Sequence, residues 1–312
     1  MSRFTAITLD LSRFPPPLAL RGLSYETILA ERRRALVEEF AGAGRVYDVE
    51  TIESDWAVIL QRLDAKRELL VGFRINDVIK AGLIAFATGA DLDHLGLTSS
   101  LHLPAPHREM MMRRVIVPAS GGAAAVMEGD DEYRRRLLLA PEAYATAGTE
   151  GGYLYHALSA DVGVINADVW ADAAAGTAHV AIQAREGLAG ASDDLVEKVR
   201  SHLHRRDVKP LTDVVSVRSV TVHEYAIKVI VYIRPGPDPA AVRAAVGDSL
   251  AAMVAGRRMP GRDVPKSAIS AAATVGPVDR VVVQQPLSDV VMGRGELAVC
   301  TGVEIAVETH DG

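Results

Sequence analysis

The sequence predicts a mixed α+β protein of several domains: an N-terminal arm with a long helix, a central α/β region and a small C-terminal α+β domain. Three observations predict this architecture. A proline-free stretch with helical apolar spacing fills residues 49–86. The second half alternates β-branched runs with capped helices. The 312 residues, 49% of them hydrophobic, suffice for two or three domains. We expect domains at 1–96, 97–213 and 214–312.

Composition argues against several classes of protein. A net charge of −6 does not suit a nucleic-acid-binding surface, which needs a concentrated basic face. The single Cys300 rules out an internal disulfide framework and a cysteine zinc site. No apolar run approaches the roughly 20 residues that span a bilayer, and the start of the chain has no signal-cleavage pattern. We therefore expect no nucleic-acid partner and no membrane partner, and assembly in a cytoplasm.

Residues 1–23 are interpreted as an extended arm. Pro15–Pro17 hold polyproline-like geometry and donate no backbone hydrogen bonds. A stiff tether is the expected role, and recognition of the prolines by a partner is the alternative. Ser24 is expected to cap a helix that runs to about Phe40. Its triple Arg32–Arg34 is interpreted as a solvated face paired with nearby glutamates.

The stretch 49–86 has the pattern of one long helix. Apolar side chains recur there in steps of three and four, as one helical face requires: Val49, Ile52, Trp56, Ile59 and Leu63. Unbroken, this helix would be about 60 Å long at roughly 1.5 Å per residue. That length exceeds an ordinary globular helix, so we expect the stripe to contact another chain. The alternative is a helical hairpin, kinked near Gly72 and packed on its own domain.

The next region, Gly89–Gly96, reads GADLDHLG. Asp91, Asp93 and His94 are residue types that bind metals, but their spacing suits a turn and a helix cap better. We expect no metal and no cofactor. The stretch 97–127 is interpreted as irregular, with a strand at Arg113–Pro118.

The stretch from Glu128 to Asp161 reads EGDDEYRRRLLLAPEAYATAGTEGGYLYHALSAD. Asp130 or Asp131 is expected to cap a short helix, because a carboxylate accepts free N–H groups and suits the positive end of the helix dipole. Tyr133 and Leu137 share one face of that helix, and three arginines surround it. Thr149 is expected to cap a second helix with Glu150 in its first turn.

The remaining chain predicts more strands and capped helices. We expect helices after Ser192, after Asp238 and from Pro265, ending near residues 203, 255 and 273. Strands are expected at 167–170, 177–184, 214–222, 225–234, 280–284 and 302–308. We expect the strands 214–222 and 225–234 to pair with each other, and the region from Val214 to the C-terminus to fold around its own core.

Catalytic motifs are missing from the sequence. It has no G-x-S-x-G nucleophile elbow, no P-loop and no H-E-x-x-H. The acidic run Glu128, Asp130, Asp131 and Glu132 offers paired carboxylates for acid–base work, but a cap and a solvated turn explain it with fewer assumptions. Arg134–Arg136 are expected to pair with acidic groups on the fold or on a neighbouring subunit, rather than to bind an anion.

The central stretch resembles the baseplate J family. The D-E-[FY]-R-x-R-L run, the L-A-P-E that follows it and T-A-G-x-E-G-x-Y-x-Y-H-A-L-S-A-D are shared. Seven matching residues stand out in this chain: Tyr133, Arg134, Arg136, Gly148, Gly151, Tyr153 and His156. Further matches lie at 88–96, 206–213, 235–239, 261–264 and 300–302, so the resemblance covers about Ser24 to Val307. It makes Cys300 a small structural residue before a strand rather than a nucleophile.

The resemblance implies a structural role without catalysis. It implies a baseplate wedge subunit of a contractile phage tail or tailocin, assembled in the bacterial host cytoplasm and present in the virion. Such a subunit lies beside the tail hub and spike, near lysozyme-like baseplate proteins, and links the hub to the outer baseplate and tail fibres. The implied partners are a second copy of this chain and a smaller I-type wedge subunit, repeated around a sixfold ring of wedges. The competing hypotheses are an enzyme that uses the Glu128–Glu132 acidic run, and a monomeric adaptor for a proline-rich or helical ligand.

Overall fold

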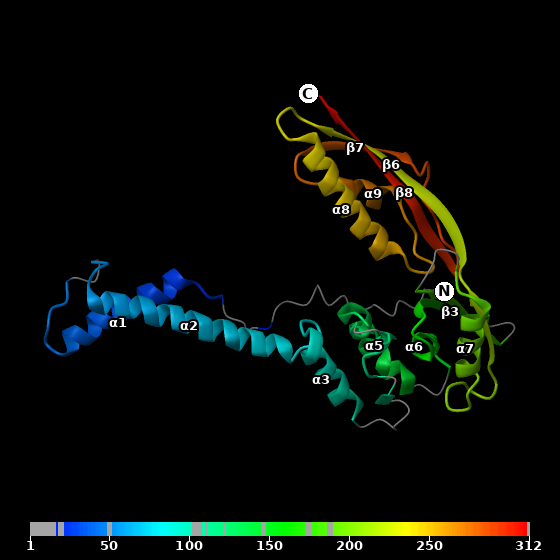
Figure 1. Cartoon of the computed structure of the whole chain (residues 1–312), viewed down its shortest axis with the longest axis horizontal. Helices are drawn as coiled ribbons and strands as arrows, with labels where there is room; N and C mark the ends of the chain where they lie inside the picture. The colour runs from blue at the N-terminus through cyan, green and yellow to red at the C-terminus, as the bar shows by residue number, and fades with distance from the viewer. Residues whose placement is uncertain are drawn as a thin grey trace. The chain divides into compact units, whose positions relative to one another are not determined.

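The computed structural model divides the chain into two compact units, within residues 7–112 and within residues 113–312 (Figure 1). The fold is mixed α+β, as the sequence predicts: the described residues form helices in the first unit, and helices with three small sheets in the second. The structure describes the residues 17, 22–48, 52–101, 108–109, 111–120, 123–144, 148–172, 176–185 and 190–310.

The first unit is built on a helical hairpin. Its elements are α1 (Tyr25–Gly42), α2 (Trp56–Ala81) and α3 (Gly89–Ser100). Ser24 caps α1 as predicted, because its Oγ accepts a hydrogen bond from Thr27 N at 3.4 Å. Helix α2 runs antiparallel to α1, and Ile28 and Leu29 of α1 pack against Ala65 of α2. The hairpin therefore has a small core of its own.

Helix α2 is shorter than the predicted helix over 49–86, which was wrong at both ends. Its 26 residues span about 39 Å at roughly 1.5 Å per residue. Asp55 sets its start, since Asp55 Oδ1 accepts hydrogen bonds from Ala57 N at 2.9 Å and Val58 N at 3.2 Å. A side chain that satisfies the free N–H groups of a first turn fixes the helix end, so this cap overrides the apolar spacing that precedes it.

The alternative of a kink near Gly72 is also wrong. Helix α2 passes through Gly72 without a break. The space for a larger side chain is taken there by Leu23, whose Cδ1 would lie 2.7 Å from an added Cβ. Gly72 thus allows the chain before α1 to approach α2 closely.

The second unit begins with a two-stranded ribbon and three helical segments. Its first elements are β1 (Val115–Val117), β2 (Val126–Met127), α5 (Asp130–Leu139), the 3-10 helix η2 (Ala140–Tyr144) and α6 (Glu150–Ala160). Strand β1 confirms the strand predicted there and pairs with β2. The Thr149 cap of α6 is also confirmed, with Thr149 Oγ1 accepting from Gly152 N at 3.0 Å.

The predicted cap of α5 was wrong. Gly129 occupies the N-cap position, and this end of the helix has no side-chain cap hydrogen bond. Asp130 and Asp131 lie one step later, in the first turn, where their charge suits the positive end of the helix dipole. Glycine tolerates this position almost as well as a polar cap does, so the acidic residues need not serve there.

A three-stranded sheet of order β3-β4-β5 follows. It consists of β3 (Val164–Asp172), β4 (Thr177–Ala184) and β5 (Val214–Ser219), with α7 (Asp193–Leu203) between β4 and β5. Strand β4 pairs antiparallel with β3 and parallel with β5. Ser192 caps α7 as predicted, because its Oγ accepts from Leu195 N at 3.3 Å. Helices α6 and α7 pack against each other and against this sheet.

The third sheet, of order β7-β6-β8, lies in the C-terminal region. Its elements are β6 (Thr221–Ile233), α8 (Pro239–Arg257), α9 (Lys266–Ala273), β7 (Val278–Gln285) and β8 (Glu296–Thr309). The predicted pairing of 214–222 with 225–234 was wrong: β5 pairs with β4, whereas β6 pairs with β7 and β8. Only Val220 separates β5 from β6, which leaves no room for the two-residue turn of a hairpin.

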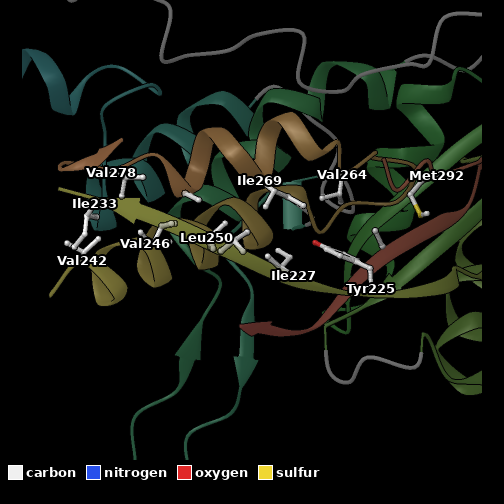
Figure 2. Close-up of a cluster of buried hydrophobic side chains, with 14 residues drawn as sticks. Tyr225, Ile227, Ile233, Val242, Val246, Leu250, Val264, Ile269, Val278 and Met292 are labelled. Atoms are coloured by element: carbon white, nitrogen blue, oxygen red, sulfur yellow. The ribbon is translucent and has the colours of Figure 1, made fainter. Parts of the chain in front are cut away.

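The core of the C-terminal region lies between this sheet and its helices. Figure 2 shows Ile227 and Ile233 of β6 facing Val246 and Leu250 of α8, with Ile269 of α9 beside them, and all five side chains are buried. The spacing of four residues along α8 turns its apolar side chains to the sheet. Asp238 caps α8 as predicted, accepting from Ala240 N at 3.0 Å, with Pro239 in the first turn.

A buried carboxylate joins the second and third sheets. Asp168 of β3 accepts hydrogen bonds from Gly295 N at 2.8 Å and from Arg294 Nη1 at 3.0 Å, just before β8 begins. The Arg218 guanidinium lies 5.3 Å from the ring centre of Trp170. Around them, four buried side chains form a small apolar cluster: Ala181, Val220, Leu297 and Val299. The two sheets are thus held by both polar and apolar contacts.

Candidate subunit interface

One face of α2 exposes a continuous row of large apolar side chains. Trp56 is 73% exposed, Ile59 50% and Leu63 47%, and all three belong to the stripe that the sequence predicts as a contact surface. Two further members of that stripe lie elsewhere. Ile52, 48% exposed, lies in the turn before α2, and Val49 is outside the described residues.

The row continues toward the middle of α2 with the spacing of a coiled coil. Steps of three and four from Trp56 pass through Lys66 and reach Leu70 and Phe73, both exposed. This is the a/d repeat in which apolar residues recur every 3.5 positions on average. We call these residues the α2 seam: Trp56, Ile59, Leu63, Lys66, Leu70 and Phe73.

The α2 seam lies beside the face that α1 covers, and it does not overlap that face. Val58 and Ala65 are fully buried, and Leu69 packs on the core that Ala65 shares with α1. Arg32 of α1 reaches Glu68 of α2 with an N–O distance of 2.7 Å at the border of this contact. Helix α1 therefore covers one side of α2. The described residues do not cover the α2 seam.

The first turn of α2 is well ordered by polar contacts. Tyr47 Oη donates a hydrogen bond to Asp55 Oδ1 at 2.6 Å, and this bond lowers the pKa of Asp55 below its usual value. The carboxylate therefore stays charged when it caps the helix. As a result, Trp56 is presented at a fixed helix start rather than on a fraying end.

The acidic run at Glu128 forms a buried ion-pair network. Arg136 is 2% exposed and contacts both oxygens of the fully buried Glu128 carboxylate, with Nε at 2.9 Å from Oε1 and Nη2 at 2.6 Å from Oε2. Arg114 Nη2 lies 3.2 Å from Glu128 Oε1. The expected solvated turn was therefore wrong for Glu128. Burial opposes ionisation of this carboxyl, but the hydrogen bonds and charges of Arg136 and Arg114 outweigh that cost and lower its pKa.

The other acidic residues of the run also face arginines. Arg113 lies 2.7 Å from Asp130, Arg134 lies 2.6 Å from the exposed Asp131, and Arg185 contacts Glu132 through both of its terminal nitrogens. The three arginines Arg134–Arg136 are predicted to pair with acidic groups of the fold. This prediction is confirmed for Arg134 and Arg136. Arg135 instead donates to Ile165 O at 2.6 Å.

The same arginines hold the C-terminal end of α6. Arg114 Nη1 donates to Leu158 O and Asp161 O, and Arg185 Nε donates to Val162 O at 2.9 Å. Leu158 lies in the last turn of α6, where carbonyl groups lack partners within the helix and cationic side chains suit the negative end of the dipole. Asp161 and Val162 follow directly after the helix. The network thus joins β1, α5, α6 and β4 into one block.

The residues shared with the baseplate J family lie mostly in the interior. Tyr133, Tyr153 and His156 are at most 3% exposed. Tyr153 Oη donates to Asp213 Oδ2 at 2.7 Å; burial and the neighbouring carboxylate both raise the pKa of Tyr153 well above its usual value. These side chains pack and bond within the fold rather than line a binding surface.

Two glycines of this set permit close approaches. Gly148 has a φ of +69°, and an added Cβ would meet the Asp213 carboxylate. At Gly151 the added Cβ would lie 2.7 Å from Glu142 Cγ. At Gly151 the atoms met belong to the Glu142 side chain, which would have to shift. Gly148 needs glycine for its backbone conformation.

The described residues contain neither a membrane-spanning helix nor a metal-binding cluster. No helix there is long and apolar enough to cross a membrane. No group of three or more His, Cys, Asp or Glu side chains in that part of the chain is arranged to hold a metal ion.

The sequence pattern predicts the apolar residues of the α2 seam. The strict repeat ends at Leu63, and Leu70 and Phe73 continue it less strictly. The Glu128–Arg136 pair has a weaker signal, because the two residues are eight positions apart across a helix start. Arg114 and Arg185 are distant in sequence, and no local spacing predicts their contacts.

Comparison with known proteins identifies the family. Models described as the Baseplate J-like N-terminal domain, central domain and protein C-terminal domain match residues 53–101, 145–219 and 225–306. A curated protein from Escherichia phage P2, named Baseplate protein J, is 34% identical over 305 residues, which cover 97% of this chain and 99% of that protein. This agreement over nearly the whole length shows that the chain belongs to the baseplate J-like family.

Proposed function

We propose that this protein is a structural wedge subunit in the baseplate of a contractile phage tail or tailocin. Membership of the baseplate J-like family supports a structural role in a baseplate. The proposed wedge links the tail hub to the outer baseplate and tail fibres, assembles in the host cytoplasm and ends in the virion. The observation that favours a subunit-binding role is the exposed α2 seam.

The α2 seam would be covered by helices of other subunits. Burying a large apolar side chain is worth roughly 1.5–3 kcal/mol, so five such side chains left in water favour association strongly. Their heptad spacing suits a helical partner, because knobs at these positions insert between the side chains of a facing helix. We assign the seam to a bundle with a second copy of this chain and one I-type wedge subunit. Lys66 interrupts the apolar row and would restrict the register of that bundle.

The competing hypotheses predict different behaviour. An enzyme that uses the acidic run would need at least one carboxylate free to exchange protons with a substrate. Glu128, Asp130, Asp131 and Glu132 each contact an arginine instead. A monomeric adaptor would keep the mass of one chain when it is mixed with other wedge subunits, which light scattering distinguishes directly.

The test is a double substitution in the α2 seam. Trp56→Asp with Ile59→Asp places two charges where the partner helix would pack, and both positions are solvent-exposed in the isolated chain. We expect the variant to fold, because neither side chain belongs to the α1–α2 core. Co-expressed with the I-type subunit, it should fail to form the heteromeric wedge by light scattering.

The control also replaces two exposed apolar side chains by aspartate, at positions outside α2. Leu211→Asp with Leu287→Asp alters residues that are 89% and 87% exposed and lie outside α2. This control should assemble like the unaltered chain. Assembly of the seam variant would show that the bundle proposal is wrong. Loss of the helical circular-dichroism signal in the seam variant alone would instead assign the seam to the internal core.

A further inference from the structure

Strand β8 has an unpaired edge. It pairs with β6 from Glu296 to Thr309, and the sheet order β7-β6-β8 leaves its other side at the border. Among the described residues, no strand pairs with that side. An edge strand presents a row of free N–H and C=O groups, which another extended segment can join by main-chain hydrogen bonds.

A cavity of about 550 Å³ lies beside the first half of this edge. Its walls come from the C-terminal half of α8, the end of β4 and residues 298–303 of β8. The α8 wall includes the small residues Ala251 and Ala255, so a row of short side chains fits between α8 and the outer side of β8. We call the edge and the cavity together the β8 groove. Every residue that lines its cavity belongs to the second unit.

A buried polar atom lines the β8 groove without a hydrogen bond. Gln183 is only 3% exposed, and its Oε1 accepts no hydrogen bond from the residues that the structure describes. Such an oxygen is costly to the fold, because it has lost its contact with water and gained no donor in return. A ligand that brings an N–H group to this oxygen would remove the cost. A polypeptide backbone carries such groups along its whole length.

The charge of the β8 groove is positive. Arg185 and Arg258 line the cavity, whereas its lining contains no aspartate and no glutamate. Arg185 shares the Glu132 carboxylate with Arg114, so one negative charge faces two positive ones. Burial lowers the pKa of the neighbouring Arg135, and repulsion from Arg114 and Arg185 adds to this effect. An excess of guanidinium groups favours a ligand that carries a carboxylate.

We propose that the β8 groove binds an extended segment of another protein, with short apolar side chains and a carboxylate, as an added strand beside β8. Main-chain hydrogen bonds to the free edge hold the segment. Its alternate side chains lie in the space next to Ala251 and Ala255, since every second side chain of a strand points to the same face. Its carboxylate contacts Arg258, and its backbone supplies the donor for Gln183. The proposal does not depend on the role in a baseplate.

The first test uses synthetic peptides and the full chain. The probe is a nine-residue peptide of alternating valine and threonine with two glutamates at each end. One control peptide carries lysines in place of the glutamates, and another keeps the glutamates but has N-methylated valines, which donate no main-chain hydrogen bonds. Cys300 is the one cysteine of the sequence and lines the β8 groove, so its alkylation rate reports whether the groove is filled.

We expect the acidic peptide to slow alkylation of Cys300 at a concentration at least about tenfold lower than either control peptide needs. Added salt should weaken this protection, because it screens the attraction between the carboxylates and the arginines. Equal protection by the lysine peptide would contradict the assigned charge. Equal protection by the N-methylated peptide would contradict the added strand.

Variants of α8 locate the peptide on the chain. Ala255→Trp fills the cavity, and Ala252→Trp makes the same change at another exposed position of α8, outside the cavity. Ala255→Trp should raise the dissociation constant of the fluorescently labelled acidic peptide at least about tenfold, whereas Ala252→Trp should leave it unchanged. Arg258→Gln should likewise weaken binding, and Arg243→Gln, on an exposed part of α8 away from the cavity, should not.

A substitution at the buried amide separates binding from folding. Gln183→Met keeps the length of the side chain and removes the oxygen that lacks a donor. The variant should unfold at a temperature no lower than the unaltered chain does, yet bind the acidic peptide more weakly. Unchanged affinity would show that Gln183 takes no part in binding. If light scattering instead shows dimers that Ala255→Trp abolishes, the occupant is a second copy of the chain, and the assignment to another protein is wrong.

Discussion

Glu128 is held at the centre of the second unit by two arginine side chains. Taking a carboxylate and a guanidinium out of water costs several kcal/mol for each ion. Only well-aligned hydrogen bonds and close opposite charges offset that cost. The bidentate contact with Arg136 and the further contact with Arg114 provide it. A local pattern of acidic residues identifies neither partner, since burial is a property of the fold. This is why the acidic run suggested a solvated turn from sequence alone.

At this scale we predict the effect of removing the Glu128 carboxylate. Glu128→Ala removes the buried carboxylate that Arg136 contacts at both oxygens, while Arg114 keeps its contact with Glu132, so the free energy of unfolding should fall by about 3–5 kcal/mol at neutral pH. Asp131→Ala is the control, because Asp131 is exposed and its pair with Arg134 contributes at most about 1 kcal/mol. Chemical denaturation followed through Trp170 fluorescence in a Trp56→Phe background would report on the second unit.

The same pair of variants has a defined pH dependence. The pKa of Glu128 is lowered in the folded state, so its stabilisation is complete above the unfolded-state pKa, about 4.3. It is lost as the pH falls from there through the folded-state pKa. The unaltered chain should therefore lose more stability on acidification below about pH 4.3 than Glu128→Ala does. Parallel stability curves for the two proteins would contradict the assigned network.

Among the elements, helix starts were the most predictable feature and strand pairing the least. Ser24, Thr149, Ser192 and Asp238 cap their helices as expected, because the cap hydrogen bond joins residues only two or three positions apart. The start of α2 was missed because Asp55 was outweighed by an apolar repeat that continues through it. Pairing of β5 with β4 joins residues about 37 positions apart, and no local rule indicates it.

For the element α6, we predict that replacing Gly148 lowers the stability of the protein by more than its backbone angle alone explains. Gly148→Ala and Gly176→Ala both force a side chain into a positive φ, +69° and +62°. Only at Gly148 does the new Cβ meet other atoms, those of Asp213 and Pro210. Gly148→Ala should therefore destabilise the chain by about 1–3 kcal/mol more than Gly176→Ala does, because the Tyr153–Asp213 contact must shift. Thermal unfolding of both variants measures this difference, and equal losses would show that the approach of Asp213 is not tight.

On the scale of the whole molecule, the chain combines a well-packed second unit with a first unit that exposes apolar surface. The second unit is held together by the Glu128 network, by the Asp168 contacts between its sheets and by the core under α8 and α9. The first unit buries only one side of α2. Such an arrangement suits a component whose helices complete their packing in an assembly. The family resemblance in the sequence indicated this role. Composition and periodicity alone indicated only a helix with an apolar face that favours association.

The measurement that tests this account most directly is hydroxyl-radical footprinting of the two tryptophans. Trp56 is 73% exposed in the α2 seam, and Trp170 stacks on His179 inside the second unit, which makes it an internal reference. Labelling is compared between the isolated chain and the chain assembled with the proposed I-type partner. We predict that assembly strongly reduces labelling of Trp56 and leaves that of Trp170 unchanged. Full labelling of Trp56 in the assembled complex would contradict the claim that the α2 seam is the subunit interface.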